Sequence, residues 1–269
     1  MIFSVTTMGT ASAMPISDRN PSAQMLNANG RLFLIDCGEG TQQQMRRSHF
    51  SFVRIEAIFI SHIHGDHLFG LFGLLNSMAM YGRTAPLDIY GPQALGSVLN
   101  FYHSFFGTDD PYEIRFHALS CREPELIHTS KCLTVSAFPL NHKIECYGFR
   151  FDETVTPRHA EANPAYRAKS YAYCSDTAPF PEEAAWLKGV DVIYHETTYL
   201  MELADQAVQR HHSTTHDAAR LALEAGARKL IIGHYSSRNQ DISLYENGCR
   251  TIFPETYAAS DGDVFEIRE

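Results

Sequence analysis

The stretch that decides the fold is residues 60–67, Ile60-Ser61-His62-Ile63-His64-Gly65-Asp66-His67. Three histidines and a carboxylate lie within six consecutive positions, directly after a largely apolar run that predicts a strand over residues 55–60. Alternate residues on an extended backbone point the same way, so His62 and His64 can reach one ion together. Gly65 permits a turn that carries Asp66 and His67 toward a second position. Imidazole and carboxylate are ligands for zinc and similar ions, and we therefore predict a metal site here.

Length and composition predict a single α/β domain over residues 1–269, built from two similar halves, roughly 1–120 and 121–269. The formal charge of -9 argues against a protein that coats nucleic acid non-specifically, although a local basic groove remains compatible with it. The sequence shows neither a basic leader followed by an apolar run nor an apolar stretch long enough to span a bilayer. We therefore expect a cytoplasmic protein with no membrane partner. The six cysteines form no Cys-x-x-Cys pair, and we expect them to be reduced and partly buried.

Strand-like and helix-like segments alternate along the chain. We predict strands at residues 2–8, 31–36, 55–60, 87–90, 133–140, 147–151, 171–175, 190–195 and 229–233. We predict helices at residues 39–49, 68–81, 94–106, 181–187, 200–210 and 213–225, the last with Ser213 as its N-cap.

Five of the predicted strands lead to residues that can bind a metal or move a proton. The strand at 55–60 leads to His62, and the later strands lead to His142, Asp176, His195-Glu196 and His234. Ligand sites in open α/β sheets gather beyond the carboxyl ends of strands. These scattered positions are therefore expected to share one cleft.

The motif at residues 61–67 resembles the His-x-His-x-Asp-His signature of the metallo-β-lactamase superfamily. More narrowly, several segments resemble the successive motifs of ribonuclease Z, in the same order. They are Ile35-Asp36-Cys37-Gly38-Glu39-Gly40-Thr41, Tyr173-Cys174-Ser175-Asp176-Thr177, His195-Glu196-Thr197-Thr198, His212-Ser213-Thr214-Thr215 and Gly233-His234-Tyr235-Ser236-Ser237-Arg238. The resemblance implies an αβ/βα sandwich, in which two mixed β-sheets pack together with helices on their outer faces.

The same resemblance implies a set of site residues. It assigns His62, His64 and His142 to one zinc, Asp66, His67 and His234 to a second zinc, and Asp176 as the bridging carboxylate. It gives His212 the role of proton donor to the leaving oxygen, while Glu196 would pair with His212 and raise its pKa. Asp66 would also orient the attacking water. Two ions per subunit are expected, with manganese as an alternative to zinc.

Arg238, Arg19 and Asn20 are candidates for contact with the substrate. Arg238 offers the forked donors that suit a phosphate, and the loop at residues 15–20 resembles a family loop near the 3′ end of the tRNA. A surface salt bridge and a plain turn are the alternatives. Short-form relatives also carry a long arm that grips tRNA from the partner of a homodimer. The corresponding interval here, residues 151–168, is expected to be too short to protrude.

These features predict a zinc-dependent endoribonuclease that removes 3′ trailers from precursor tRNA, leaving a 3′-hydroxyl on the tRNA and a 5′-phosphate on the trailer. The resemblance implies a homodimer. The short interval at 151–168 favours a second reading, a phosphodiesterase that acts on other RNA or small phosphodiesters. An acyl hydrolase with the same metal core and a non-catalytic RNA-binding scaffold remain as more distant alternatives.

Overall fold

Two mixed β-sheets form the centre of the protein. The computed structural model describes residues 2–106 and 111–268. Within them, one sheet has the strand order β14-β1-β2-β3-β4-β5-β6 and the other has the order β13-β12-β11-β10-β9-β8-β7. The first sheet comprises β1 (Phe3–Gly9), β2 (Ala23–Ala28), β3 (Arg31–Ile35), β4 (Ile55–Phe59), β5 (Leu87–Pro92), β6 (Ile114–Leu119) and β14 (Val264–Glu266). The second comprises β7 (Glu125–Thr129), β8 (Leu133–Pro139), β9 (Tyr147–Glu153), β10 (Ser170–Cys174), β11 (Val192–Glu196), β12 (Lys229–Gly233) and β13 (Thr256–Ala258).

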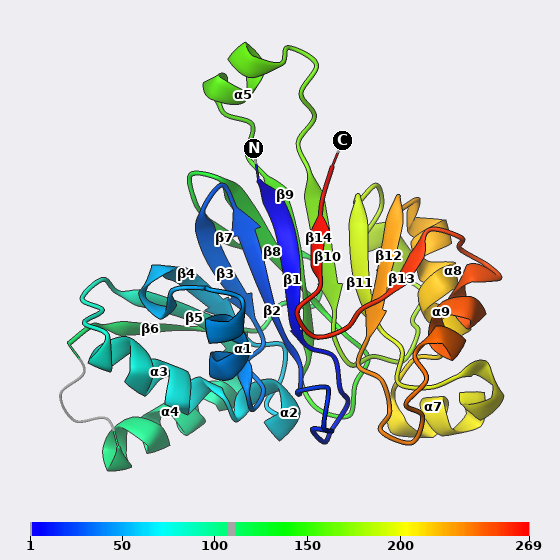
Figure 1. Cartoon of the computed structure of the whole chain (residues 1–269), viewed down its shortest axis with the longest axis horizontal. Helices are drawn as coiled ribbons and strands as arrows, with labels where there is room; N and C mark the ends of the chain where they lie inside the picture. Colours follow the sequence, from blue (N-terminus) through cyan, green and yellow to red (C-terminus); the bar gives the residue numbers. More distant parts are fainter. Residues whose placement is uncertain (1, 107–110, 269) are drawn as a thin grey trace.

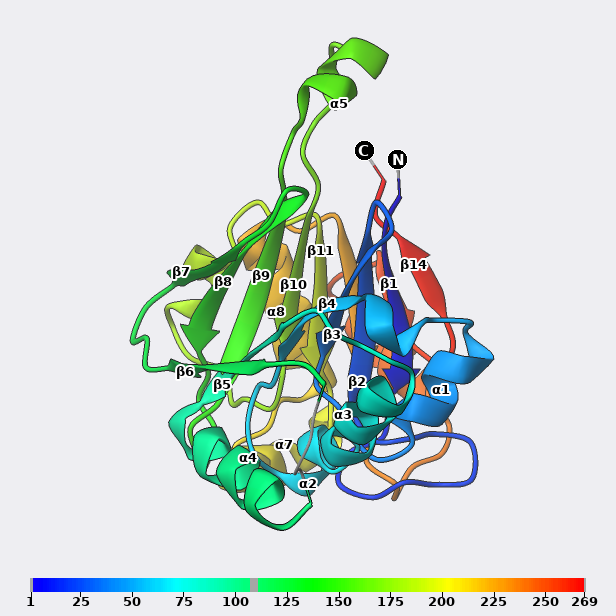
Figure 2. The same ribbon diagram turned by 90° about the vertical axis from the view of Figure 1, so that its left-hand side faces the viewer.

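Helices cover the outer faces of both sheets (Figures 1 and 2). The helices are α1 (Thr41–Arg47), α2 (Gly65–Leu68), α3 (Leu71–Met80), α4 (Gln93–Phe105), α5 (Pro157–Ala162), α6 (Glu183–Trp186), α7 (Ala204–Arg210), α8 (Thr215–Ala225) and α9 (Ser243–Arg250). Short 3-10 turns occupy Phe52–Arg54 and Met201–Leu203. No helix in the described part of the chain combines the length and apolar character needed to cross a bilayer.

Aromatic side chains fill the space between the sheets. Phe59 of β4 packs on Phe149 and Phe151 of β9, with ring centroids 5.5 and 5.4 Å apart. These rings belong to a buried cluster that draws residues from both sheets. Separate apolar clusters lie under the helices of each half, so the molecule has the layered helix–sheet–sheet–helix architecture predicted from the sequence.

The chain passes from the first sheet to the second near residue 120, and only its last strand returns to the first sheet within the described residues. β6 ends at Leu119 and β7 begins at Glu125, but β14 at the end of the chain returns to the first sheet and pairs antiparallel with β1. The last strand therefore joins the first half of the chain to the second.

Two predictions about the helices were wrong. The predicted helix over residues 68–81 is two helices, because the chain bends at Gly70, whose N–H donates to the Cys37 carbonyl at 2.9 Å. The N-cap of α8 is Thr214 rather than Ser213, since the Asp217 N–H donates to the Thr214 hydroxyl at 3.3 Å. Ser213 instead donates its hydroxyl to the Thr177 carbonyl at 2.7 Å.

The interval after β9 does protrude, contrary to the sequence-based expectation. It forms a short arm that carries α5 away from the body, at the end of the sandwich opposite α2 (Figures 1 and 2). The arm is ordered by a small cluster of side chains, in which the His159 ring stacks on Tyr166 with centroids 4.7 Å apart. The Tyr166 hydroxyl donates to Glu153 at the base of the arm, 2.7 Å away.

Candidate metal centre and active site

Four of the predicted ligands form a first group at the ends of β4, β8 and β10. The His64 Nδ1 atom lies 3.1 Å from Nε2 of His62 and 3.4 Å from Nε2 of His142. The Asp176 Oδ2 atom lies 3.7 Å from the His62 nitrogen and 3.8 Å from the His142 nitrogen. The structure therefore points three imidazole nitrogens and one carboxylate oxygen at a common position.

A second group lies on the other side of Asp176. The Nε2 atoms of His67 and His234 are 3.4 Å apart, and Oδ2 of Asp66 lies 3.5 and 3.4 Å from them. The Asp176 Oδ1 atom lies 3.4 Å from the His67 nitrogen and 3.2 Å from the His234 nitrogen. Asp176 thus presents one carboxylate oxygen to each group, which is the arrangement of a bridging ligand.

Both groups fit divalent cations. Most of the separations exceed a normal hydrogen bond and match the roughly 3.3 Å between donors that share a tetrahedral ion at about 2.0 Å. The Asp176 Oδ1 atom is buried without a hydrogen-bond partner. Burial lowers the pKa of His62 well below its ordinary value, which keeps that imidazole neutral and able to bind a metal. For His67, burial favours the neutral form, but Asp176, Asp66 and Asp36 outweigh it and raise the pKa, so this position attracts positive charge.

Hydrogen bonds fix the orientation of the ligand rings. The Asp36 carboxylate lies 2.7 Å from His67 Nδ1 and also accepts from the Ser61 N–H and the Tyr173 hydroxyl. The His142 Nδ1 donates to the His211 carbonyl at 3.0 Å, and the His234 Nδ1 lies 2.8 Å from the Thr198 hydroxyl. Such partners select the tautomer that leaves the opposite nitrogen free for a metal.

The backbone is strained close to these groups. Four of the non-glycine residues with positive φ lie at the site, namely Ala13, Asp36, His211 and His234, with φ between 53° and 60°. Residues other than glycine adopt this region at a cost, and such residues concentrate at functional sites. At Ala13, which has a positive φ, the backbone N–H donates to Oδ2 of Asp66 at 2.8 Å and so helps to hold this candidate ligand.

His212 and Glu196 form a buried pair beside both ligand groups. The His212 Nδ1 lies 2.9 Å from Oε1 of Glu196 and 4.0 Å from Oδ2 of Asp176. Glu196 is fully buried and also accepts from the N–H groups of Ser213 and Thr198. Burial opposes charge on His212, but Glu196 outweighs it and raises the pKa of His212 to about 9. The pair therefore holds a proton at the edge of the metal centre.

The site opens into a cleft of about 510 Å³. Its lining residues are Ser12, Ala13, Pro15, Pro21, Glu39, His64, Gly65, Asp66, Phe69, Asp176, His212 and His234. No Lys or Arg is among them within the described ranges. The Phe69 ring stands at the cleft with 67% of its surface exposed, and an exposed ring can stack on a nucleic-acid base.

The three predicted substrate-contacting residues do not join this cleft. Arg19 is buried and its guanidinium donates to the Gln240 carbonyl at 2.6 Å. The Asn20 side chain donates to Asp261 at 2.9 Å. Arg238 is exposed, but it donates to Gln206 of α7 at 3.2 Å rather than lining the cleft. Arg19 and Asn20 hold their loop against the C-terminal part of the chain.

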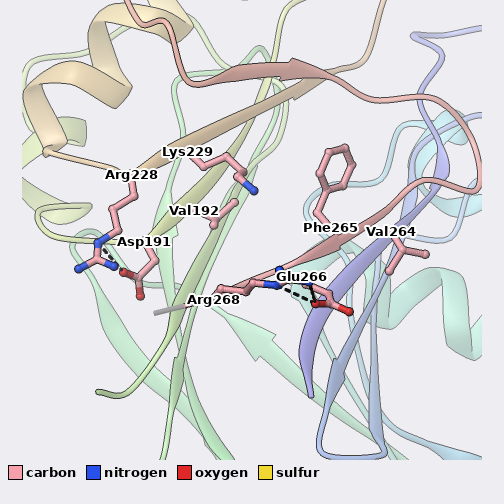
Figure 3. A pocket seen from close by; sticks show the side chains of 8 residues that line it. All are labelled: Asp191, Val192, Arg228, Lys229, Val264, Phe265, Glu266 and Arg268. Atoms are coloured by element: carbon pink, nitrogen blue, oxygen red, sulfur yellow. Dashed lines mark hydrogen bonds and ion pairs between the residues drawn. The ribbon is translucent and has the colours of Figure 1, made fainter. Parts of the chain in front are cut away.

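A different cavity, of about 600 Å³, lies at the opposite ends of β11 and β12 (Figure 3). Its charged groups largely compensate one another: Asp191 lies 3.6 Å from Arg228, and Glu266 lies 2.6 Å from Arg268. None of the predicted site residues lines it. The chemistry of the molecule therefore gathers at the carboxyl ends of the strands.

Sequence reasoning missed the roles of Asp36, Thr198 and Phe69. Asp36 follows β3 and precedes a Cys-Gly pair, so its position at a strand end was the available signal. Thr198 lies two residues after Glu196, within a motif that the sequence had already singled out. Phe69 gave no signal, because an aromatic residue next to an apolar helix predicts a core position.

Comparisons with known proteins agree with this geometry. Residues 31–235 match the family described as the beta-lactamase superfamily domain. The chain is 36% identical to "Ribonuclease Z" of Bacteroides thetaiotaomicron over 295 positions, covering 96% of this chain and 93% of that one. It is 33% identical to "Ribonuclease Z" of Porphyromonas gingivalis, covering 96% and 97% of the two chains.

Solved structures give the same result. The structure of human tRNase Z, short form, superimposes with a TM-score of 0.83 at 28% identity, covering 99% of this chain and 100% of that one. A diphosphatase of the PhnP family shares the fold, with a TM-score of 0.71 at 20% identity over 99% and 98% of the chains. With the extended sequence match, this shows that the chain belongs to the ribonuclease Z family of the metallo-β-lactamase superfamily.

Proposed function

We propose that this protein is a metal-dependent endoribonuclease that removes 3′ trailers from precursor tRNA, leaving a 3′-hydroxyl on the tRNA and a 5′-phosphate on the trailer. The observation that carries the proposal is the His212–Glu196 pair, since His212 lines the cleft together with members of both ligand groups. A bridging carboxylate between two cation positions suits attack on a phosphodiester, and a positioned acid suits the departure of an alkoxide.

The metal complement that we propose is two zinc ions per subunit. His62, His64 and His142 would hold one, Asp66, His67 and His234 the other, and Asp176 would bridge them. The donor set is borderline-soft imidazole with carboxylate, which suits zinc and also accepts manganese. Bound divalent ions would supply a nucleophile from water at neutral pH and neutralise charge on the phosphate.

The remaining chemistry falls to side chains of the chain itself. Asp66 is held by the Ala13 N–H and would orient the attacking water while it also binds metal. His212 uses Nδ1 toward Glu196, so its Nε2 is the nitrogen left to give a proton to the leaving 3′ oxygen. Glu196 would keep the ring in that tautomer and favour its protonated form.

A second candidate, a phosphodiesterase acting on other RNA or small phosphodiesters, is favoured by the lining of the cleft. Glu39 lines the cleft together with the acidic ligands, and no cation offsets them among the described lining residues. Two cationic groups near the arm are engaged in ion pairs: Arg167 pairs with Asp191, and Arg150 lies 3.0 Å from Asp152.

The two candidates separate on substrate choice. Zinc-loaded protein is incubated with a precursor tRNA carrying a 3′ trailer, an unstructured RNA of the same length and a chromogenic phosphodiester. The tRNA proposal predicts a much higher kcat/KM for the precursor than for the unstructured RNA. Equal rates on both RNAs, or cleavage of the chromogenic ester alone, would contradict it and support the second candidate.

We also propose that the protein is a homodimer that pairs through an aromatic face on α3 and α4. We define this face as Met80, Phe101, Phe105 and Phe106, whose exposed fractions lie between 57% and 79%. Phe101 and Phe106 also line a hollow of about 420 Å³ with Phe72. The Phe101 and Phe105 rings lie 4.7 Å apart, and exposed aromatic side chains that cluster in this way are typical of protein–protein contacts.

We place this activity in the cytoplasm. All six cysteines are free and buried, which is the usual state of thiols in a reducing compartment. Fractionation of cells that express the natural protein, with activity found outside the cytosolic fraction, would contradict this placement.

A further inference from the structure

A third cluster of side chains that could bind a metal ion lies on β10, β11 and α6, outside the cleft. Cys174 ends β10, Glu183 begins α6 and His195 lies on β11, and their ligand atoms all fall within 4.8 Å of one another. All three residues are at least 97% buried. His195 precedes Glu196 on the same strand, so the two side chains point to opposite faces. His195 is therefore turned away from the cleft that Glu196 serves.

The hydrogen bonds of this cluster leave one ring nitrogen of His195 facing an unpartnered carboxylate oxygen of Glu183. His195 Nδ1 lies 2.7 Å from the Glu196 carbonyl, which can only accept, so Nδ1 carries the proton. The other ring nitrogen, Nε2, faces Oε1 of Glu183 at 3.6 Å, and burial is outweighed by Glu183, which raises the pKa of His195, so this position attracts positive charge. That buried oxygen has no hydrogen-bond partner. The separation is too long for a hydrogen bond and is close to the roughly 3.3 Å between two donors on one tetrahedral ion.

Charge and access both suit a divalent cation at this position. A carboxylate and a thiolate neutralise two positive charges, and a neutral imidazole completes three ligands, so the buried site would carry no net charge. Glu183 and His195 also line a cavity of about 150 Å³, which has room for a water as fourth ligand. We propose that Cys174, Glu183 and His195 bind a further zinc ion, separate from the two ligand groups of the cleft.

Binding at this site would release the thiol proton of Cys174 to the solvent and tie α6 to β10 and β11. Those strands deliver Asp176 and Glu196 to the cleft, so the ion would stabilise the strand ends on which the catalytic groups stand. The site is a stabilising element and needs no contact with substrate. The proposal therefore stands independently of RNA cleavage.

Cobalt substitution tests the site by spectroscopy. The cleft groups offer only imidazole and carboxylate ligands, so a thiolate-to-cobalt charge-transfer band in the near ultraviolet reports this cluster alone. Metal-free protein titrated with Co²⁺ is expected to develop the band and to take up one more ion per chain than the Cys174→Ala variant. Cys132→Ala, at a buried cysteine between the sheets, is expected to match the wild type in both measurements.

Two further variants test whether loss of the band in Cys174→Ala could come from misfolding rather than from loss of a ligand. Glu183→Gln keeps the shape of the side chain and is expected to weaken binding at the cobalt–thiolate site at least tenfold. His142→Ala removes a cleft ligand and is expected to leave the charge-transfer band unchanged. No band in the wild type, or the same band and metal content in Cys174→Ala, would overturn the proposal.

Discussion

At the scale of single residues, we expect the loss of His212 to lower the rate most for substrates with a poor leaving group. The 3′ oxygen of RNA needs a proton to depart, whereas a nitrophenolate does not. We expect His212→Ala to lower kcat on RNA by about 10²- to 10⁴-fold, the usual contribution of a general acid, and to change the rate on a nitrophenyl phosphodiester far less.

The neighbouring His211 supplies the control for this comparison. Its backbone carbonyl, rather than its ring, holds His142, and asparagine tolerates its positive φ. His211→Asn is therefore expected to retain activity on both substrates. Equal losses in His212→Ala on the two substrates would argue against a proton-donor role.

Asp36 is the residue through which the protein orients His67. Asp36→Asn keeps the shape and tolerates the positive φ, but it removes the negative charge beside His67 Nδ1. We expect metal affinity at the second ligand group to fall by about 10- to 100-fold, as is typical when such a partner is lost. Competition with a fluorescent chelator measures this, and an unchanged affinity would show that Asp36 serves the fold alone.

The clustering of the candidate ligands could be predicted, because these residues lie at strand ends. His62, His64, Asp66 and His67 are adjacent in sequence, and His142, Asp176 and His234 each follow a strand that reaches the same edge of the sandwich. Arg19 and Asn20 could not be placed, because their partners Gln240 and Asp261 lie more than 200 residues away in a segment without a clear pattern.

At the scale of elements, close packing at Gly70 separates α2 from α3, although the sequence pattern predicts one continuous helix. A Cβ at Gly70 would lie 2.1 Å from the Gly38 carbonyl oxygen, so two backbone segments approach too closely for any side chain. We expect Gly70→Ala to lower the free energy of unfolding by about 1–3 kcal/mol or more, the usual cost of overpacking. Chemical denaturation followed by circular dichroism measures the change.

Gly73 is the matched control, three residues further into α3. A Cβ there would meet only the end of the Gln42 side chain, which can move. Alanine favours a helix over glycine by about 1 kcal/mol, so Gly73→Ala is expected to be neutral or stabilising. If both variants lost the same stability, close packing at Gly70 would not be the reason for the bend.

Several of the elements that the sequence did not predict have weak local patterns. β7 and β6 are largely exposed on at least one face, and β13 and β14 are only three residues long. Such strands carry too few buried residues for a two-residue period to stand out. α9 was also missed, since Gly248 interrupts its apolar positions. Most of the buried strands were predicted within a few residues, but β2, which is buried along most of its length, was missed.

At the scale of the whole molecule, the aromatic face makes the oligomeric state testable. A glutamate in place of Phe101 or Phe105 would put a charge in a buried dimer contact, which is costly. We expect Phe101→Glu to convert the dimer to a monomer in sedimentation equilibrium, while Val208→Glu, an equally exposed apolar position on α7, leaves it dimeric. A wild-type protein that is monomeric at micromolar concentration would contradict the proposal.

The arm lies at the end of the sandwich opposite α2 (Figure 1), and the α2 residues Gly65 and Asp66 line the cleft in which we expect the cut to occur. The chemistry of this cut is the central claim, and the ends of the products test it most directly. A precursor tRNA with a 3′ trailer is cleaved by the zinc-loaded protein, and both fragments are analysed by mass spectrometry. The account predicts one cut, with a 3′-hydroxyl on the tRNA and a 5′-phosphate on the trailer; a 2′,3′-cyclic phosphate or a 3′-phosphate on the tRNA fragment would contradict it.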